Sequence, residues 1–155
     1  MRSKEYVIAI AVLGLITYTM GLSLVTQAYP ANQSVKKLSS GGAIQITASE
    51  GLGVYSNYQC TMEMTVIDWG TLEPGATQTI LVYVKNEGDS PATLSLETSN
   101  WIPSAASEYL TLNWNYYNQI INPGSNTQVA LTLSVDQSIQ GIENFSFDIS
   151  IIGNN

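Results

Sequence analysis

The stretch IDWGTLEPGATQTILVYVKNEG, residues 67–88, combines a turn signal with a regular alternation of side chains. Pro74-Gly75 is the turn signal, because proline presets φ for the first central turn position and glycine accepts the positive φ that can follow it. The run 77–86 then places Ile80, Val82 and Val84 on one face against Leu81, Tyr83 and Lys85 on the other. A period of two indicates a half-buried β-strand. This stretch therefore predicts a turn that leads into a strand.

Similar short runs recur after residue 42, separated by Gly, Pro, Asn and Ser, and no window shows a helical repeat. The runs lie at 43–49, 54–67, 77–86, 92–98, 109–116, 128–135 and 145–152. About seven strands, with turn signals roughly every 8–12 residues, are typical of a two-sheet sandwich. We therefore predict an all-β domain over 43–153, a single Ig-like antiparallel β-sandwich.

An apolar segment precedes this domain. Residues 6–28 hold 23 apolar or small residues, and Arg2 and Lys4 come before them. As a helix the segment would be about 34 Å long, enough for a hydrocarbon core of about 30 Å. Its length favours the interpretation of residues 1–28 as a retained transmembrane helix. The small residues up to Ala28 leave a cleaved signal peptide as the alternative. Both alternatives export the rest of the chain, as the positive-inside tendency also indicates.

Residues 29–42 predict a flexible linker, because they are polar, contain Pro30 and end in Gly-Gly. Two sequons are candidate N-glycosylation acceptors in an exported chain, one at Asn32 in the linker and one at Asn144 at the start of the last strand. The linker and the apolar segment together predict a domain held at the cell surface, or secreted if cleavage occurs near Ala28.

The charge and the reactive side chains limit the chemistry of the exported part. From Tyr29 onward, three lysines and eleven acidic residues give a net charge of −8, which disfavours nucleic acid as a partner. The chain has no histidine and one cysteine, Cys60, which we expect to be a small buried side chain; the alternative is a disulfide partner for another chain. These counts predict no intramolecular disulfide, no zinc or copper site, no cofactor and no Ser-His or Cys-His catalysis. The acids around Glu87–Asp89 and Asp136 offer too few ligands to predict a calcium site.

Aromatic residues are the candidates for a binding surface. The pair Asp68-Trp69 is interpreted as structural, with Asp68 accepting turn N–H groups and Trp69 buried, because Gly70 and Pro74-Gly75 follow at once. Trp114 is in phase with Leu110 and Leu112 and is expected in the core. The candidate binding aromatics, for carbohydrate or protein, are Trp101, Tyr55, Tyr58 and Tyr117.

The first predicted strand, 43–49, has a second interpretation. It follows a Gly-Gly hinge and carries Ile44 and Ile46 on one face. Such a terminal strand can pair with its own sheet or with the open edge of a second copy of the chain. We expect this strand either along a sheet edge or projecting away, and intramolecular docking is favoured because it avoids the entropy cost of association.

Motifs spread over residues 50–153 resemble a family of small proteins. The W-G-x-L-x-P-G pattern at 69–75, VYVKNEG after it, NWIPSAASEYLTLNWNY and the closing FSFDISIIG resemble archaeal envelope proteins with an N-terminal hydrophobic segment and one Ig-like sandwich. More loosely, the layout is similar to the camelysin and biofilm-fibre group, with the archaeal bundling pili, whose subunits lend a strand to a neighbour. The resemblance implies a non-catalytic structural or adhesive role, with copies of the chain or other envelope proteins as partners. A binding module remains the alternative.

Overall fold

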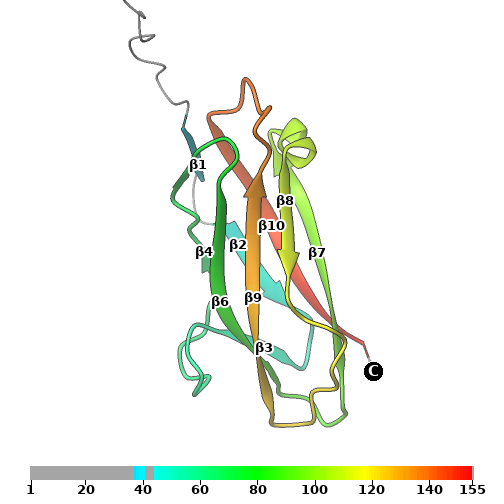
Figure 1. Cartoon of the computed structure of the whole chain (residues 1–155). Coiled ribbons are helices and arrows are strands. Elements are labelled where there is room, and N and C mark those ends of the chain that lie inside the picture. Colours follow the sequence, from blue (N-terminus) through cyan, green and yellow to red (C-terminus); the bar gives the residue numbers. More distant parts are fainter. Residues whose placement is uncertain (1–36, 41–43, 155) are drawn as a thin grey trace, which may run out of the picture. The chain divides into compact units, whose positions relative to one another are not determined.

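Two β-sheets pack face to face in the computed structural model, which describes residues 37–40 and 44–154 (Figure 1). The predicted membrane or signal segment 6–28 lies outside these residues. The elements in chain order are β1 Leu38–Ser40, β2 Ile44–Ala48, β3 Leu52–Tyr55, β4 Val66–Ile67, β5 Thr71–Leu72, β6 Thr77–Asn86, β7 Thr93–Ile102, the 3₁₀ helix η1 Ser104–Glu108, β8 Leu110–Trp114, β9 Asn126–Val135 and β10 Asn144–Asn154. The prediction of an all-β sandwich is confirmed.

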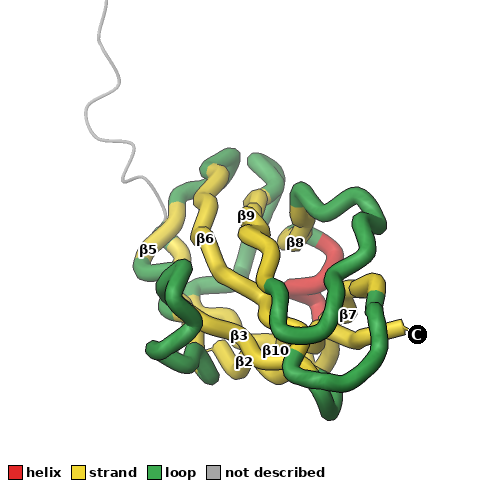
Figure 2. Tube along the Cα trace, turned by 90° about the horizontal axis from the view of Figure 1, so that it is seen from below, coloured by secondary structure: helices red, strands yellow, loops and turns green. Residues whose placement is uncertain are grey.

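One sheet has the order β3-β6-β9-β8, with antiparallel pairing throughout. In the other, β10 is central: β7 pairs with one of its edges, and β1 and β2 pair with the other. β5 continues the sheet beyond β1, and β4 continues it beyond β2. Figure 2 shows these two layers in a view along the strands.

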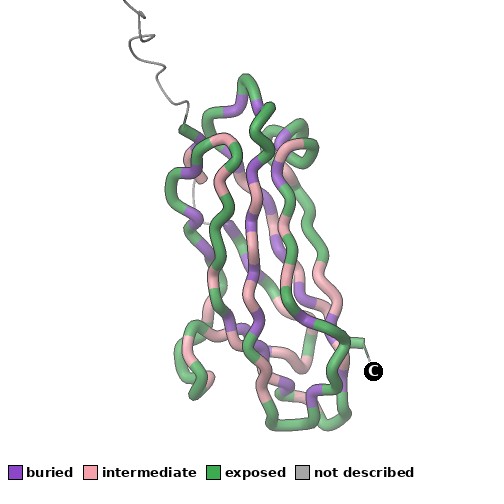
Figure 3. Tube along the Cα trace, viewed as in Figure 1, coloured by how far each residue is buried: buried purple, intermediate pink, exposed green. Residues whose placement is uncertain are grey.

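The core lies between the layers and follows the alternation predicted from the sequence. Along β9, Val129, Leu131, Leu133 and Val135 are buried, while the residues between them remain partly accessible (Figure 3). Phe145, Phe147, Ile149 and Ile151 do the same along β10. Burying such a side chain stabilises the fold by about 1.5–3 kcal/mol, so these two strands form the centre of the hydrophobic core.

The prediction of a purely antiparallel sandwich is wrong for the first and last strands. β1 and β2 both run parallel to β10, with Ser39 opposite Asn144 and Ile46 opposite Ile149. Parallel neighbours need a long connection, and here nearly the whole domain lies between them. Because no hairpin turn joins β10 to β1 or to β2, neither strand has to run antiparallel to β10.

The predicted linker 29–42 is too long at its C-terminal end. Leu38 is completely buried and begins β1, which pairs with both β10 and β5. A strand of three residues with one apolar side chain shows no period, so the sequence did not reveal it.

The predicted strand 54–67 is two separate strands, β3 and β4. The chain between them crosses from one sheet to the other: Met64 N–H donates to Val54 O at 2.8 Å, and Thr65 O accepts from Ile46 N–H at 2.9 Å. This crossing turns Met62 outward, with 62% of its surface exposed. The alternation in this run is therefore not the alternation of one strand.

Candidate functional site

The N-terminal strands β1 and β2 include Ile44 and Ile46, the residues predicted from the sequence as candidates for strand exchange. Ser39 N–H donates to Glu143 O at 2.8 Å, and Ser49 N–H donates to Ile151 O at 2.9 Å. Leu38 and Ile44 are completely buried, and Ile46 is 2% exposed. The two strands thus contribute backbone pairing to β10 and side chains to the core.

The first predicted strand docks within its own chain, as the intramolecular alternative expects. It is not at the edge of the sheet, because β4 pairs with Ile44 and Gln45 on its free side. Beyond that point, a cleft of about 240 Å³ separates β2 from β3. The cleft is bordered by Thr47 and Ala48 on one side and by Leu52 and Gly53 on the other. The C-terminal half of β2 is therefore less enclosed than its first half.

Asp68 ties the turn after β4 to β1. Its Oδ1 accepts from Gly70 N–H at 2.8 Å and from the Ser40 hydroxyl at 2.8 Å. These hydrogen bonds lower the pKa of Asp68 because they favour its ionised form, and the bond from Gly70 has the larger effect. Trp69 is 1% exposed, and its indole N–H has no partner among the described residues. Asp68-Trp69 is therefore a structural turn, as predicted.

The turn signal that follows is also confirmed. Ala76 N–H donates to Glu73 O at 2.9 Å across Pro74-Gly75, and Gly75 has a φ of +80°. This is the conformation in which proline and glycine occupy the two central turn positions. The turn leads directly into β6, which begins at Thr77.

The four predicted binding aromatics do not form one surface. Tyr55 lies on β3, and Tyr58 lies in the loop after it, with its ring 6.0 Å from that of Tyr83 on β6. Trp101 belongs to the other sheet, where it is half-buried, and Tyr117 follows β8 with 85% of its surface exposed. The structure thus brings Tyr55 and Tyr58 to the same region and adds Tyr83. The signal for Tyr83 was its place on the outward face of the run 77–86.

A bulge turns Trp101 toward the core. The prediction places it in a loop, yet β7 continues through it to Ile102. Asn100 adopts a φ of +54°, which asparagine tolerates better than most residues, and its amide donates to Asp148 Oδ2 at 2.6 Å. The pairing with β10 shifts at this point, and the Trp101 ring stacks on Phe147 at 4.1 Å. This indole packs against the core.

Trp114 also packs against the core, as predicted. It is half-buried and lies 5.1 Å from the ring of Tyr116. The Tyr116 hydroxyl accepts from Leu94 N–H at 3.0 Å and donates to Gln119 O. Since Trp69, Trp101 and Trp114 all serve the core, no binding surface is built from the three indoles.

Cys60 and the sequons are the candidate modification positions. Cys60 is a free, half-buried thiol in the loop after β3, not the buried side chain expected, because the loop lies outside the sandwich. Burial is the largest cause that raises its pKa. Asn144 is exposed at the first position of β10, whereas Asn32 lies outside the described residues.

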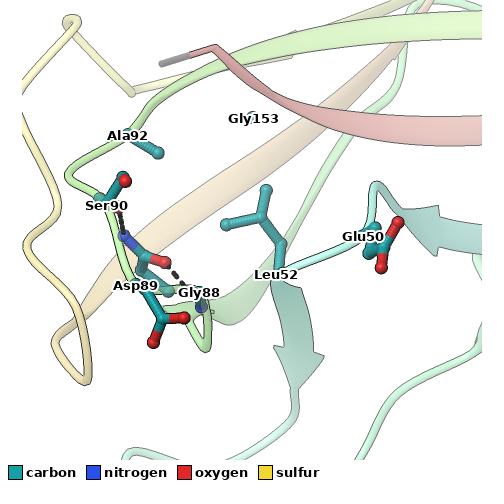
Figure 4. Close-up of a pocket in the computed structure, with 9 residues that line it drawn as sticks. Glu50, Leu52, Gly88, Asp89, Ser90, Ala92 and Gly153 are labelled. Atoms are coloured by element: carbon teal, nitrogen blue, oxygen red, sulfur yellow. Dashed lines mark hydrogen bonds between the residues drawn. The ribbon is translucent and has the colours of Figure 1, made fainter.

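The acidic residues do not gather into a metal site within residues 37–40 and 44–154. A polar pocket of about 120 Å³ is lined by Glu50 and Asp89. Their carboxylates lie on opposite sides of Leu52 (Figure 4). The buried Asn86 also lines the pocket, and its amide donates to Ser90 O at 2.8 Å and to Ile121 O at 2.9 Å. The Asn86 amide is therefore used in holding the turn that lines the pocket.

No protein-family model matches the chain, and no curated protein matches it. Within the part of the chain that the structure describes, no helix is long and apolar enough to cross a membrane.

Proposed function

We propose that this protein is a non-catalytic, Ig-like structural or adhesive module of the cell envelope, whose copies join by exchanging the segment β1–β2. In this proposal, residues 6–28 hold the chain in the membrane and the sandwich lies outside the cell. The observation that supports it is the docking of β1 and β2 on β10, with Leu38, Ile44 and Ile46 buried in the core.

Exchange would replace each intramolecular contact of β1 and β2 by the same contact in a neighbouring copy. The hydrogen bonds and buried side chains would not change, so the two arrangements differ mainly in the entropy of association and in strain in the connection 49–51 between β2 and β3. Anchoring the chains in one membrane raises their local concentration and so reduces that entropy difference. An exchange that continues from copy to copy would give a filament, and one that closes would give a dimer.

Locking β2 onto its own β10 tests this proposal. Thr47 and Ser150 are opposite each other, with their hydroxyl oxygens 3.5 Å apart. We expect the full chain carrying Thr47→Cys and Ser150→Cys in a Cys60→Ser background to form an internal disulfide when oxidised. The oxidised protein should remain monomeric in detergent and form no filaments in negative-stain micrographs, because the strand cannot leave.

Reduction of the same protein is the matched control, and it should restore assembly. The proposal is wrong if the oxidised protein assembles as well as the reduced one. It is equally wrong if the protein with only Cys60→Ser stays monomeric at every concentration and in the membrane.

A further inference from the structure

Three tyrosines share one end of the outer face of the sheet β3-β6-β9-β8. Tyr55 on β3 is directly opposite Tyr83 on β6, and Tyr83 is directly opposite Gln128 on β9. Tyr58 packs edge-to-face against Tyr83, with 81° between the two rings. We call Tyr55, Tyr58 and Tyr83 the tyrosine cluster. Tyr58 is 67% exposed, which is a large exposed fraction for an aromatic side chain in an ordered loop.

Side-chain hydrogen bonds hold the loop that carries Tyr58. Asn57 Oδ1 accepts from Thr61 N–H at 3.1 Å and from Met62 N–H at 3.0 Å, closing the loop on itself. Asn126 on β9 donates from its amide to Tyr58 O at 3.2 Å, which fixes the loop to the sheet. The exposed ring is thus positioned before any ligand arrives, and less conformational entropy is lost on binding.

Tyr55 is held by two neighbours. Its hydroxyl donates to Glu87 Oε1 at 2.6 Å. This hydrogen bond is the largest cause that raises the pKa of Tyr55 to about 12, because it favours the protonated hydroxyl. Its ring lies over Gly53, where a Cβ atom would be only 2.5 Å from a ring carbon. Glycine at position 53 therefore gives this ring the room to lie against the strand.

Three charged groups lie beside the tyrosine cluster: Lys85, Glu87, and Glu63, which forms an isolated β-bridge with Tyr55 and whose negative charge contributes to raising the Tyr55 pKa. Lys85 Nζ lies 3.4 Å from Glu87 Oε1, so this cation and this anion form a pair. Glu63 forms no salt bridge among the described residues, so these groups carry one net negative charge. The other polar groups are neutral: the Gln128 amide donates to the Tyr83 hydroxyl at 2.6 Å, and Asn126 presents a second amide. A surface of rings, hydroxyls and amides with one net negative charge disfavours an anionic ligand and matches one that is neutral and rich in hydroxyl groups.

From this geometry we infer that the tyrosine cluster binds a neutral oligosaccharide. The exposed ring of Tyr58 offers an apolar face for the C–H face of a sugar, and the amides of Gln128 and Asn126 offer hydrogen bonds for its hydroxyl groups. This inference does not depend on strand exchange, because none of these residues belongs to β1, β2 or β10.

The test uses the full chain in detergent micelles and three neutral hexasaccharides, those of β-1,4-linked glucose, β-1,4-linked N-acetylglucosamine and α-linked mannose. NMR shifts of the Tyr58, Asn126 and Gln128 amides should respond to at least one sugar at concentrations up to about 10 mM, where weak complexes with millimolar Kd values are populated. Tyr58→Ala should weaken that binding by about tenfold, as the loss of an exposed aromatic anchor does.

Ile102→Ala is the matched control, because Ile102 is 66% exposed and lies on the other sheet. It should change the Kd by less than about twofold, since a site away from the ligand contributes little. The inference is overturned if no sugar shifts these amides, or if the two substitutions weaken binding equally. It is also overturned if Tyr58→Ala changes the oligomeric state and leaves sugar binding intact, because the cluster would then bind a second copy of the chain.

Discussion

Replacing Ile46 by aspartate should lower the free energy of unfolding by more than about 4 kcal/mol, because it removes a buried aliphatic side chain and puts an unpaired carboxylate in its place. Ile46 is 2% exposed and belongs to the strand that the exchange proposal makes transferable. Urea denaturation of the full chain, followed by circular dichroism in detergent, measures the change.

The adjacent residue provides the control for this substitution. Gln45 is exposed on the same strand, so Gln45→Asp should cost less than about 1 kcal/mol, the range of β-propensity effects. Equal losses for the two variants would show that β2 is not docked through its isoleucine face. A small loss for Ile46→Asp would show that the domain is stable without this strand.

Phe147→Ala should lower the free energy of unfolding by about 3–5 kcal/mol, as expected for truncating a buried aromatic side chain. Phe147 is 1% exposed, stacks on Trp101 at 4.1 Å and lies 6.4 Å from the ring of Phe145. Its loss leaves a cavity at the centre of β10 and also exposes one face of Trp101. Urea denaturation with tryptophan fluorescence reports both effects.

Tyr117→Ala is the matched aromatic control. Because Tyr117 is 85% exposed, this substitution should change stability by no more than about 0.5 kcal/mol. If Phe147→Ala were as mild as this control, β10 would not be the centre of the core.

The strongly periodic strands could be predicted from the sequence, and the shortest strands could not. β6 covers Thr77–Asn86, the same residues as the predicted run, because ten residues show a period of two clearly. β4 and β5 have two residues each and are stabilised by pairing with β2 and β1, which no local pattern reveals. The position of β10 between the antiparallel β7 and the parallel β1 and β2 depends on contacts far apart in the sequence.

The candidate sites could be predicted in part, for a similar reason. The buried face of Ile44 and Ile46 follows from their spacing. The orientation of Trp101 does not, because it depends on the bulge at Asn100 and on a partner strand about 50 residues away in the sequence. The contact of Tyr83 with Tyr58 does not follow from spacing either, because it depends on how the loop carrying Tyr58 folds back onto the sheet.

Disulfide formation between two chains that carry their cysteine at different positions tests strand exchange most directly. One full chain would carry Thr47→Cys and the other Ser150→Cys, both with Cys60→Ser, and they would be mixed, assembled and oxidised. Exchange places residue 47 of one copy opposite residue 150 of the next, in the register that the two residues have within one chain, so we expect covalent heterodimers. Ser146→Cys in place of Ser150→Cys is the control and should give few, because Ser146 is four residues away along β10. Heterodimers no more abundant with Ser150→Cys than with Ser146→Cys would contradict the proposed exchange.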